Sequence, residues 1–414
     1  MICCINMPAR RQQRHSDVRA NRASEASFEL LARLAPPDRL RLSAAMTGPR
    51  YTPLALTLPA TVPFVGPETQ ERQRGAPFVA RIGANESVFG PSPRAIDAMQ
   101  RAAGEIWMYG DPENYELRHA LAVHHGVAPE NIVVGEGIDG LLGYLVRLLV
   151  GHGDAVVTSD GAYPTFNYHV AGFGGVLHKV PYRDDHEDPT ALFAKAAEVD
   201  AKLVYLANPD NPMGTWHSGE DIVSALEALP EGCLVVLDEA YVECAPEGTA
   251  APVAADDSRV IRMRTFSKVY GMAGARVGYA IGSSELIASF NKVRNHFGMN
   301  RAAQAGALAA LKDEDWLTHV QQRIAGSRNR IEEISRSNGL LPLPSATNFV
   351  AIDCGRDGVF AKAVLDTLVE QGVFVRMPFA APQNRCIRVS CGGEAEMAAF
   401  EAALPTALAK ARAS

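Results

Sequence analysis

The sequence predicts an α/β fold in which a large domain, built on a mostly parallel sheet, is followed by a smaller α+β domain. Two observations predict it. Between about residues 95 and 315, short apolar runs alternate with helical stretches, and such alternation requires crossover connections with helices on both faces of a parallel sheet. After about residue 315, long helices surround a few short strands instead, which is typical of an α+β domain.

The elements of the large domain follow from helix-start residues and apolar runs. We expect a helix from residue 94 onward, because Ser92 and Pro93 form a good helix start. A second helix is expected at residues 219–229. Short apolar runs bounded by turn residues predict strands at residues 131–134, 155–158, 202–207, 233–237, 259–265 and 277–281.

The smaller domain begins with a long helix at about residues 316–338, which carries mixed charge on one face. The remaining pattern predicts strands at residues 347–353, 373–376 and 385–390, a helix near 358–371 and a final helix. We find no repeat and no low-complexity segment in the body of the chain.

Composition excludes several classes of protein. The net charge of −7 gives no hint of nucleic-acid binding. The sequence has no run of about 18 uncharged apolar residues, so no membrane span is expected. The seven cysteines are scattered without a CxxC pair, so we expect neither a disulfide framework nor a metal site. These features favour a cytoplasmic protein.

The first 50 residues differ from the rest of the chain. They are rich in arginine and lack a sustained apolar stretch, so they do not read as a secretory signal. Acidic residues among them also weaken the alternative of an arginine-rich transit peptide. We expect a flexible tail, or a segment upstream of a working start at Met46.

Chemistry-bearing residues follow the predicted strands, where ligands bind in open parallel sheets. After residues 131–134 comes Gly135-Glu-Gly-Ile-Asp-Gly140, which opens a helix. The backbone N–H groups of Ile138 and Asp139 can face a phosphate there. The GxGxxG pattern, with Asp160 beyond it, is by itself equally a dinucleotide fingerprint or a turn without a ligand.

The next three strand ends add an aromatic ring, an amide and a carboxylate. Phe166 can lie on a planar ring or pack in the core. Asn211 lies in a rigid loop with two Asn-Pro steps. Asp238, followed by Tyr241, ends an apolar strand. A carboxylate there needs a cationic partner, such as a ligand nitrogen, or caps the next helix.

The strand at residues 259–265 leads into Thr265-Phe-Ser267-Lys268, with Arg276 eight residues after the lysine. A lysine in a dry site loses its proton readily and becomes a nucleophile, whereas a lone lysine is most often a surface charge. Hydroxyls and a guanidinium suit a phosphate. Together the strand ends offer the groups that pyridoxal phosphate (PLP) needs: a Schiff-base lysine, an anion for the pyridinium nitrogen and phosphate anchors.

On these motifs the sequence resembles the fold-type I, class I/II aminotransferases over about residues 60–400, and most closely the histidinol-phosphate aminotransferase group. The segments Thr-Phe-Ser-Lys-(x)7-Arg and Asn-Pro-x-Asn-Pro-x-Gly carry the resemblance, with Ala84-Asn85-Glu86 as a possible entry motif. The resemblance implies a large PLP-binding domain with a mostly parallel seven-stranded sheet between helices, plus a smaller α+β domain. The expected boundaries are 1–50 for the tail, 51–94 for an N-terminal arm and part of the small domain, 95–315 for the large domain and 316–414 for the small domain.

The resemblance also implies roles for the cofactor residues. Lys268 would hold PLP as a Schiff base and shuttle the proton, Asp238 would pair with the pyridinium nitrogen, and Phe166 would stack on the ring. Tyr241 and Asn211 would hydrogen-bond the phenolic oxygen. The phosphate would be held by the N–H groups of Ile138 and Asp139, by Ser267 and Arg276, and by Tyr109 of a neighbouring subunit, which implies a homodimer with shared active sites.

For the substrate, the resemblance implies that Arg388 clamps the α-carboxylate and that Arg376 meets the far end, a phosphate in histidinol phosphate. Relatives often carry a phosphate-contacting tyrosine where this chain has Phe64. The expected activity is PLP-dependent transamination of histidinol phosphate, in histidine biosynthesis, or of an aromatic amino acid, with 2-oxoglutarate as acceptor.

Three other functions are open at this point. A PLP-dependent decarboxylase acting on an amino-acid phosphate would share every cofactor residue. A PLP-dependent regulator would need a DNA-reading domain, and the 50-residue head shows no convincing helix-turn-helix. An NAD dehydrogenase would rest on GxGxxG alone and leave Lys268, Asp238 and Asn211 unexplained.

Overall fold

The computed structural model describes residues 48–60 and 65–413. These residues group into two compact units, Met1–Gln70 and Glu71–Ser414. In the first unit, helix α2 (Pro53–Thr57) starts at Thr52, whose hydroxyl accepts a hydrogen bond from the Ala55 N–H at 3.2 Å. Most of the predicted tail, the proposed start at Met46 and the substitution at Phe64 lie outside the described residues.

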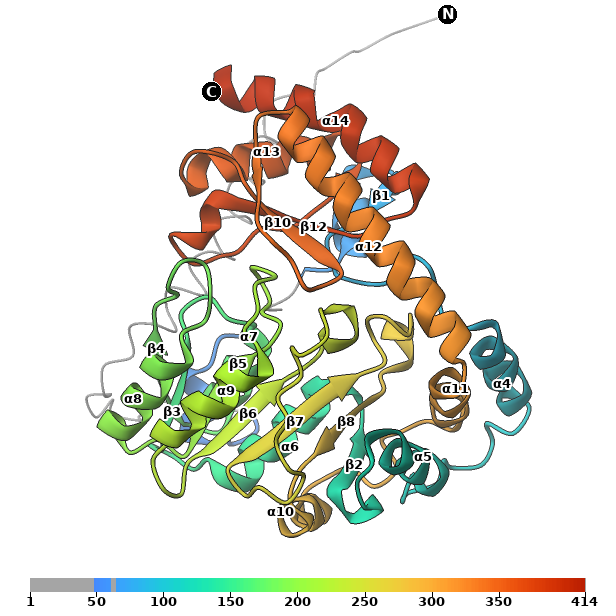
Figure 1. Ribbon diagram of the computed structural model, residues 1–414, viewed down its shortest axis with the longest axis vertical. Helices are drawn as coiled ribbons and strands as arrows, with labels where there is room; N and C mark the ends of the chain where they lie inside the picture. The colour runs from blue at the N-terminus through green and yellow to red at the C-terminus, as the bar shows by residue number, and fades with distance from the viewer. Residues whose placement is uncertain (1–47, 61–64, 414) are drawn as a thin grey trace, which may run out of the picture. The chain divides into compact units, whose positions relative to one another are not determined.

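The larger sheet of the second unit has seven strands in the order β2-β8-β7-β6-β5-β3-β4 (Figure 1). Their bounds are β2 Ile132–Gly135, β3 Ala155–Ser159, β4 Val176–Val180, β5 Leu203–Ala207, β6 Leu234–Asp238, β7 Val260–Thr265 and β8 Gly278–Ile281. Strand β8 is antiparallel to both neighbours, β2 and β7, and the remaining pairings are parallel. The predicted mostly parallel sheet is confirmed, and all its strands except β8 end at the same edge.

Helices cover both faces of this sheet, and alternate residues along each strand pack against opposite layers. In β6, Leu234 and Val236 join the core under α6 and α7. Val235 and Leu237 point the other way, into the core under α8 and α9. Near β2 and β8, that second face is covered by α4, α5 and α11. The helix bounds are α4 Pro93–Ala103, α5 Tyr115–His125, α6 Gly137–Leu149, α7 Pro164–Gly172, α8 Pro189–Val199, α9 Gly219–Ala225, α10 Ser284–Ser289 and α11 Arg301–Leu311.

Strand β4 was missed among the apolar runs. It lies at the edge of the sheet and pairs with β3 alone. Only Val180 of this strand is buried, whereas Val176 and Lys179 are exposed. An edge strand with little burial does not need a continuous apolar run, so its sequence signal is weak.

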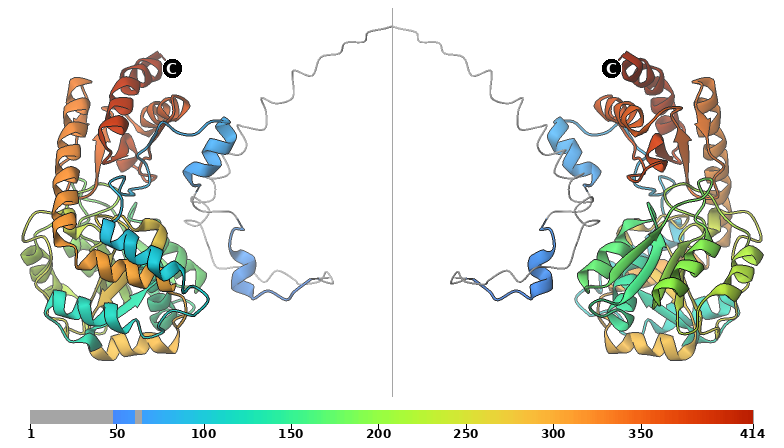
Figure 2. Two further views of the ribbon diagram at one scale, coloured as in Figure 1. Left: turned by 90° about the vertical axis from the view of Figure 1, so that its right-hand side faces the viewer. Right: turned by 90° about the vertical axis from the view of Figure 1, so that its left-hand side faces the viewer.

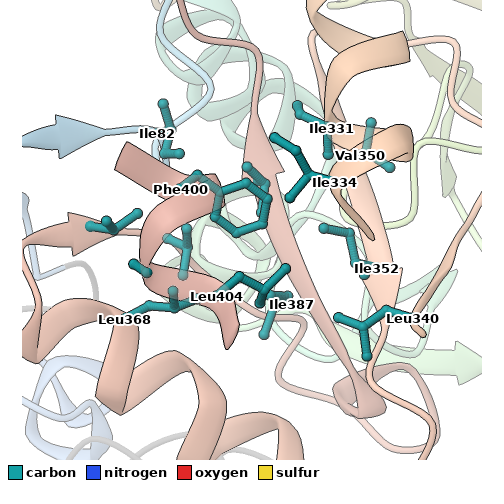
Figure 3. Packing of buried hydrophobic residues seen from close by; sticks show 14 of the residues in the cluster. Ile82, Ile331, Ile334, Leu340, Val350, Ile352, Leu368, Ile387, Phe400 and Leu404 are labelled. Atoms are coloured by element: carbon teal, nitrogen blue, oxygen red, sulfur yellow. The ribbon is translucent and has the colours of Figure 1, made fainter. Parts of the chain in front are cut away.

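A second sheet of the same unit is antiparallel, in the order β12-β10-β9. Figure 3 shows Val350, Ile352 and Ile387 of this sheet packing with Phe400 and Leu404 of helix α14 in one apolar core. The predicted elements appear in the expected order: α12 Glu314–Ser337, β10 Phe349–Asp353, α13 Gly358–Glu370, β11 Val373–Phe374, β12 Cys386–Ser390 and α14 Glu394–Ala413. Strand β9 (Leu341–Pro342), which the sequence analysis did not predict, lies between α12 and β10.

Helix α12 connects the larger and the smaller sheet, and a separate two-stranded sheet, of β1 (Ala80–Arg81) and β11, packs in the core of the smaller one. Helix α12, orange in Figure 2, contacts α11 beside the larger sheet and β10 and α14 of the smaller one. Strand β1 pairs in parallel with β11, and Ala80 and Ile82 lie in the core of the smaller sheet. Residues 80–82 therefore pack with the smaller sheet, and the exact domain boundaries stay predictions.

Two further observations concern the described residues alone. Cys233, Cys244, Cys354, Cys386 and Cys391 are free and buried. Within residues 48–60 and 65–413, no helix is both long and apolar enough to cross a membrane.

Candidate active site

The site lies where parallel strands of the larger sheet end. Strand β6 ends at Asp238, and β7 ends at Thr265, three residues before Lys268. Helix α6 begins at Gly137, directly after β2, and a loop containing Asn211 follows β5. Because these strands run in the same direction, their carboxyl ends present these groups at one edge of the sheet.

Lys268 is a buried amine at this edge. Its Nζ lies 5.2 Å from the centre of the Tyr241 ring and donates a hydrogen bond to the Asn85 carbonyl at 3.4 Å. Burial lowers the pKa of Lys268 to about 8, because removing the ammonium from water disfavours its charged form. A substantial fraction of the amine is therefore neutral near physiological pH and able to act as a nucleophile or base.

Asp238 is a buried carboxyl held by two donors. The Tyr205 hydroxyl donates to its Oδ2 at 2.6 Å, and the Ala240 N–H donates to its Oδ1 at 2.9 Å. Burial raises the pKa of Asp238. No lysine or arginine lies within ion-pair distance of it among the described residues, so a cationic ligand nitrogen would supply the partner that a buried carboxylate needs.

The start of helix α6 forms a cradle for an anion. Gly137 has a φ of 77°, and a β-carbon there would lie 2.5 Å from the Arg276 Nη2, so the guanidinium lies directly against the first residue of the helix. Arg276 also donates to the Ser267 hydroxyl at 3.3 Å. The first-turn N–H groups of Ile138 and Asp139, a hydroxyl and a guanidinium thus converge on one place.

The side chain of Asp139 points away from this role. Its Oδ1 is 2.8 Å from the His169 Nε2. Only the backbone of Asp139 is therefore available to an anion at the helix start.

Arg388 of β12 reaches from the smaller sheet into the site. Its Nη1 donates to the Asn211 Oδ1 and its Nη2 to the Gly83 carbonyl at 3.2 Å, while its guanidinium lies 5.1 Å from the Phe349 ring centre. Burial lowers the pKa of Arg388 to about 10. Its Nε is buried and has no hydrogen-bond partner among the described residues, which leaves a donor for an incoming anion.

Arg376 lies beside Arg388. The Arg376 N–H donates to the Arg388 carbonyl at 3.2 Å, and the Arg388 N–H donates to the Arg376 carbonyl at 2.6 Å. Burial lowers the pKa of Arg376 as well. Two partly buried guanidiniums on adjacent backbone segments have the donors that an anion with two charges, or two carboxylates, requires.

Phe166 does not lie in the site. It has no exposed surface, and its ring stacks on Tyr205 with centroids 4.8 Å apart and planes 19° apart. Tyr163, three residues earlier, is half-buried at the start of α7. Its phenol is close enough to Lys268 and Arg376 to affect the pKa of both. The packing alternative therefore describes Phe166, whereas Tyr163 is an aromatic residue near Lys268.

A family model described as aminotransferase class I and II matches residues 79–403. The chain belongs to this aminotransferase family. The histidinol-phosphate aminotransferase of Moorella thermoacetica is 34% identical over 367 residues, which cover 88% of this chain and 94% of the relative. Histidinol-phosphate aminotransferase 1 of Mesorhizobium japonicum is 35% identical over 342 residues, which cover 81% of this chain and 92% of the relative.

A solved structure gives the same picture for this aminotransferase. Histidinol-phosphate aminotransferase from Sinorhizobium meliloti, in complex with pyridoxal-5′-phosphate, is 54% identical, with a TM-score of 0.85 and coverage of 88% of this chain and 99% of that one. The chain is thus a PLP-dependent aminotransferase of fold type I. These named relatives are aminotransferases, so they give no support to the decarboxylase alternative.

The residues of the aminotransferase site fit PLP. An electropositive cradle at α6 suits the phosphate, and the buried Asp238 suits a protonated ring nitrogen. The amine of Lys268 has its pKa lowered to about 8. Tyr241 and Asn211 are both buried polar groups on loops at the same edge. A GxGxxG turn that cradles a phosphate without a dinucleotide is consistent with this set.

Tyr109 lies apart from these residues. It is 78% exposed, its ring centre is 4.9 Å from that of Phe297, and its carbonyl accepts a hydrogen bond from Arg301. None of these contacts is with Lys268 or the cradle, so within one subunit the described residues do not bring Tyr109 into the site.

Sequence reasoning missed two further residues. Tyr205 donates to Asp238 from the middle of the buried strand β5, and a phenol in an otherwise apolar strand was the available signal. Asn85 contacts both Lys268 and Tyr241, and its only signal was the short motif in which it lies.

Proposed function

We propose that this enzyme transfers the amino group of histidinol phosphate to 2-oxoglutarate, a step of histidine biosynthesis. The partly buried pair Arg376 and Arg388 carries the proposal, and the names of the relatives support it. We also propose that the enzyme is cytoplasmic, because its five described cysteines are free, as is usual in a reducing compartment.

The charges of the two substrates match this pair. Histidinol phosphate carries a phosphate dianion one methylene group from its amine carbon and has no carboxylate. Glutamate and 2-oxoglutarate carry two carboxylates. Both kinds of molecule need two cationic, fork-shaped donors, which Arg376 and Arg388 supply in adjacent positions.

We further propose the cofactor contacts. Ser267, Arg276 and the N–H groups of Ile138 and Asp139 hold the phosphate, and Asp238 pairs with the ring nitrogen. When bound, PLP supplies a carbonyl that takes up the amino group and a ring that withdraws electrons. Tyr163, rather than Phe166, covers the ring, because Tyr163 lies near Lys268 and Phe166 is fully buried against Tyr205.

The remaining chemistry belongs to side chains of this chain. Lys268 holds the cofactor until the donor displaces it. Its Nζ then takes the proton from the donor carbon that bears the amine and gives this proton up again in the following step. Burial, which lowers its pKa to about 8, keeps enough of this amine neutral to accept the proton. Tyr241 and Asn211 lie on the loops beside it and orient the ring oxygen.

The visible spectrum tests the substrate. Histidinol phosphate should bleach the absorption of the bound cofactor, and 2-oxoglutarate should restore it. Histidinol without phosphate should react about 100-fold less efficiently, because a buried charged contact contributes about 2–5 kcal/mol. Arg376→Leu, at the arginine expected to meet the phosphate, should lower kcat/KM for histidinol phosphate by about 100-fold and leave the rate with histidinol nearly unchanged. Steady-state kinetics with both donors measures this difference.

Arg259→Leu is the control for this experiment, because Arg259 pairs with Asp257 outside the site. It should leave both donors unaffected. Phenylalanine and glutamate belong in the same panel. If phenylalanine reacts as well as histidinol phosphate, the substrate is an aromatic amino acid instead. If an amino-acid phosphate releases carbon dioxide, the decarboxylase alternative returns.

We also propose that the enzyme is a homodimer with shared active sites. An exposed apolar patch supports this: Trp107 is 81% exposed, Tyr109 78%, Ile106 65% and Phe297 53%. Aromatic residues gathered on a surface are typical of a protein interface. Tyr109 lies apart from the cofactor site of its own subunit, which fits a role in the cofactor site of a second subunit.

Mixing two defective variants tests the sharing. Tyr109→Ala should bind PLP about tenfold more weakly, since a hydrogen bond to a charged group contributes about 1.5–3 kcal/mol. Lys268→Ala retains Tyr109 but cannot turn over. Subunit exchange between the two should restore about one quarter of wild-type activity at limiting PLP. About half of randomly paired dimers are mixed, and one of the two sites in each mixed dimer is complete.

Tyr109→Phe is the matched control, since it keeps the ring against Phe297 and removes only the hydroxyl. It should remain dimeric by sedimentation and show the weaker PLP binding. An exchanged mixture without recovered activity would place Tyr109 in its own subunit or outside the site.

A further inference from the structure

Asn85 is a buried residue with contacts to the smaller sheet and to the loops that follow strands of the larger one. It follows β1 and has a left-handed backbone with φ 57°, which asparagine tolerates better than most residues. Its side chain and backbone make contacts with Tyr241 and Lys268 on one side and with Asn348 and Ser390 on the other. No role in the reaction follows from the cofactor contacts proposed above, yet two of its four partners are site residues.

Ser390 determines which way the Asn85 amide faces. The Ser390 hydroxyl donates to the Asn85 Oδ1 at 2.9 Å and accepts the Asn85 N–H at 3.0 Å. A hydroxyl has a single proton, and this arrangement uses it on the amide oxygen. In this arrangement the NH₂ end of the amide faces the opposite partner, which is Tyr241.

The amide in turn directs the Tyr241 hydroxyl. The Asn85 Nδ2 donates to the Tyr241 oxygen at 3.0 Å, so the phenol is an acceptor in this contact. Burial raises the pKa of Tyr241, and its proton therefore stays in place. The phenol proton is therefore not used in the contact with Asn85, and it can be donated to a ligand in the site.

The carbonyl of Asn85 faces Lys268. The Lys268 Nζ donates to it at 3.4 Å, and the Asn348 Nδ2 donates to the same oxygen at 2.9 Å. Asn348 thus holds the carbonyl at a defined position. The carbonyl accepts a hydrogen bond from the lysine amine when that amine is not joined to the cofactor.

We propose that Asn85 is a positioning residue of the reaction. Its amide makes Tyr241 a donor to the ring oxygen of the cofactor, and its carbonyl holds the free amine of Lys268 for proton transfer. The inference rests on the proposed function, because both partners are assigned to cofactor chemistry there.

Asn85→Asp tests the proposal with almost no change of shape. A carboxylate cannot donate, so the Tyr241 proton should turn toward it and away from the ring oxygen. Loss of this donor and the added negative charge both favour the protonated form of the cofactor–lysine linkage. The pH midpoint of the visible absorption change of the holoenzyme should therefore rise by about one unit. We expect kcat to fall about 10- to 100-fold, with a smaller change in KM.

Asn131→Asp is the matched control. The Asn131 amide donates to the Gly282 carbonyl at 3.0 Å, at the opposite edge of the larger sheet. This variant should leave the pH midpoint unchanged. Asn85→Gly is a second test variant, because glycine accepts the left-handed backbone without strain and keeps the carbonyl. It should raise the midpoint by less than Asn85→Asp, since it removes the donor to Tyr241 without adding charge.

The outcomes are distinguishable. A midpoint in Asn85→Asp equal to that of the wild type overturns the proposal, even if thermal unfolding shows lower stability. If that variant does not fold, an unshifted midpoint in Asn85→Gly overturns it instead. A wild-type protein without the visible band, or without transamination, contradicts the proposed function and not the hydrogen-bond network of Asn85.

Discussion

Replacing Lys268 with alanine should abolish the visible absorption of bound cofactor and reduce turnover at least about 10⁴-fold, the upper range of a proton-transfer group. The lysine both holds the cofactor and moves the proton, so no other described side chain replaces it. PLP should still bind, more weakly, through the cradle and Asp238. Absorption spectra, single-turnover kinetics and a PLP titration measure the three effects. Turnover within tenfold of the wild type would contradict the assignment of Lys268.

The same variant has an expected effect on stability. Burial lowers the pKa of Lys268 from 10.5 to about 8, so the folded apo protein opposes its charged form. This cost is fully present below pH 8 and disappears as the pH rises toward 10.5. Lys268→Ala should therefore increase apo stability most near pH 7, and the gain should shrink between pH 8 and 10.5. Lys292→Ala, at an exposed lysine, is the control and should show neither effect.

Asp238→Asn should lower kcat by about 10²- to 10⁴-fold while leaving the apo protein no less stable. The amide cannot stabilise a protonated ring nitrogen, so the ring withdraws electrons less effectively. Stability should not fall, because burial raises the pKa of Asp238 and the carboxylate is therefore unfavourable in the apo protein. Steady-state kinetics with saturating PLP and thermal unfolding without PLP measure the two quantities.

Glu239→Gln provides the contrasting control one residue away. Glu239 is buried and accepts a hydrogen bond from Arg264 at 2.7 Å. Removing its charge leaves the Arg264 guanidinium with the longer ion pair to Glu243, at 4.0 Å, and loss of the close pair costs about 3–5 kcal/mol. This variant should lose stability with a much smaller loss of kcat. A folded Asp238→Asn enzyme with full activity would remove the proposed electronic role of Asp238.

Local patterns in the sequence determined most of the fold. Apolar runs and turn residues predicted six of the seven strands of the larger sheet, and the elements predicted after residue 315 appear in the expected order. These signals are local, because a buried strand needs apolar residues on both faces wherever it lies in the sheet. Strand β4 was missed since its exposed edge position relaxes that requirement.

The residues that we propose to hold the cofactor were also candidates in the sequence, because the ends of parallel strands must meet at one edge. This rule placed Lys268, Asp238 and Asn211 together, and the resemblance to aminotransferases supplied the roles expected for them and for Arg276. The placement of side chains within the loops did not follow from it. Only packing shows that Phe166 stacks on Tyr205 in the core and that Tyr163 is an aromatic residue near Lys268.

Long-range contacts were decided by the tertiary structure alone. Arg388 and Asn211 are 177 residues apart and meet in one hydrogen bond, and Asn85 meets Ser390 across 305 residues. Such pairs depend on how the smaller sheet packs beside the larger one, which no local pattern encodes. The sequence by itself therefore determined the chemistry available at the strand ends, and tertiary packing decided which of those groups touch, because a hydrogen bond depends on the distance and direction between two atoms and not on their positions along the chain.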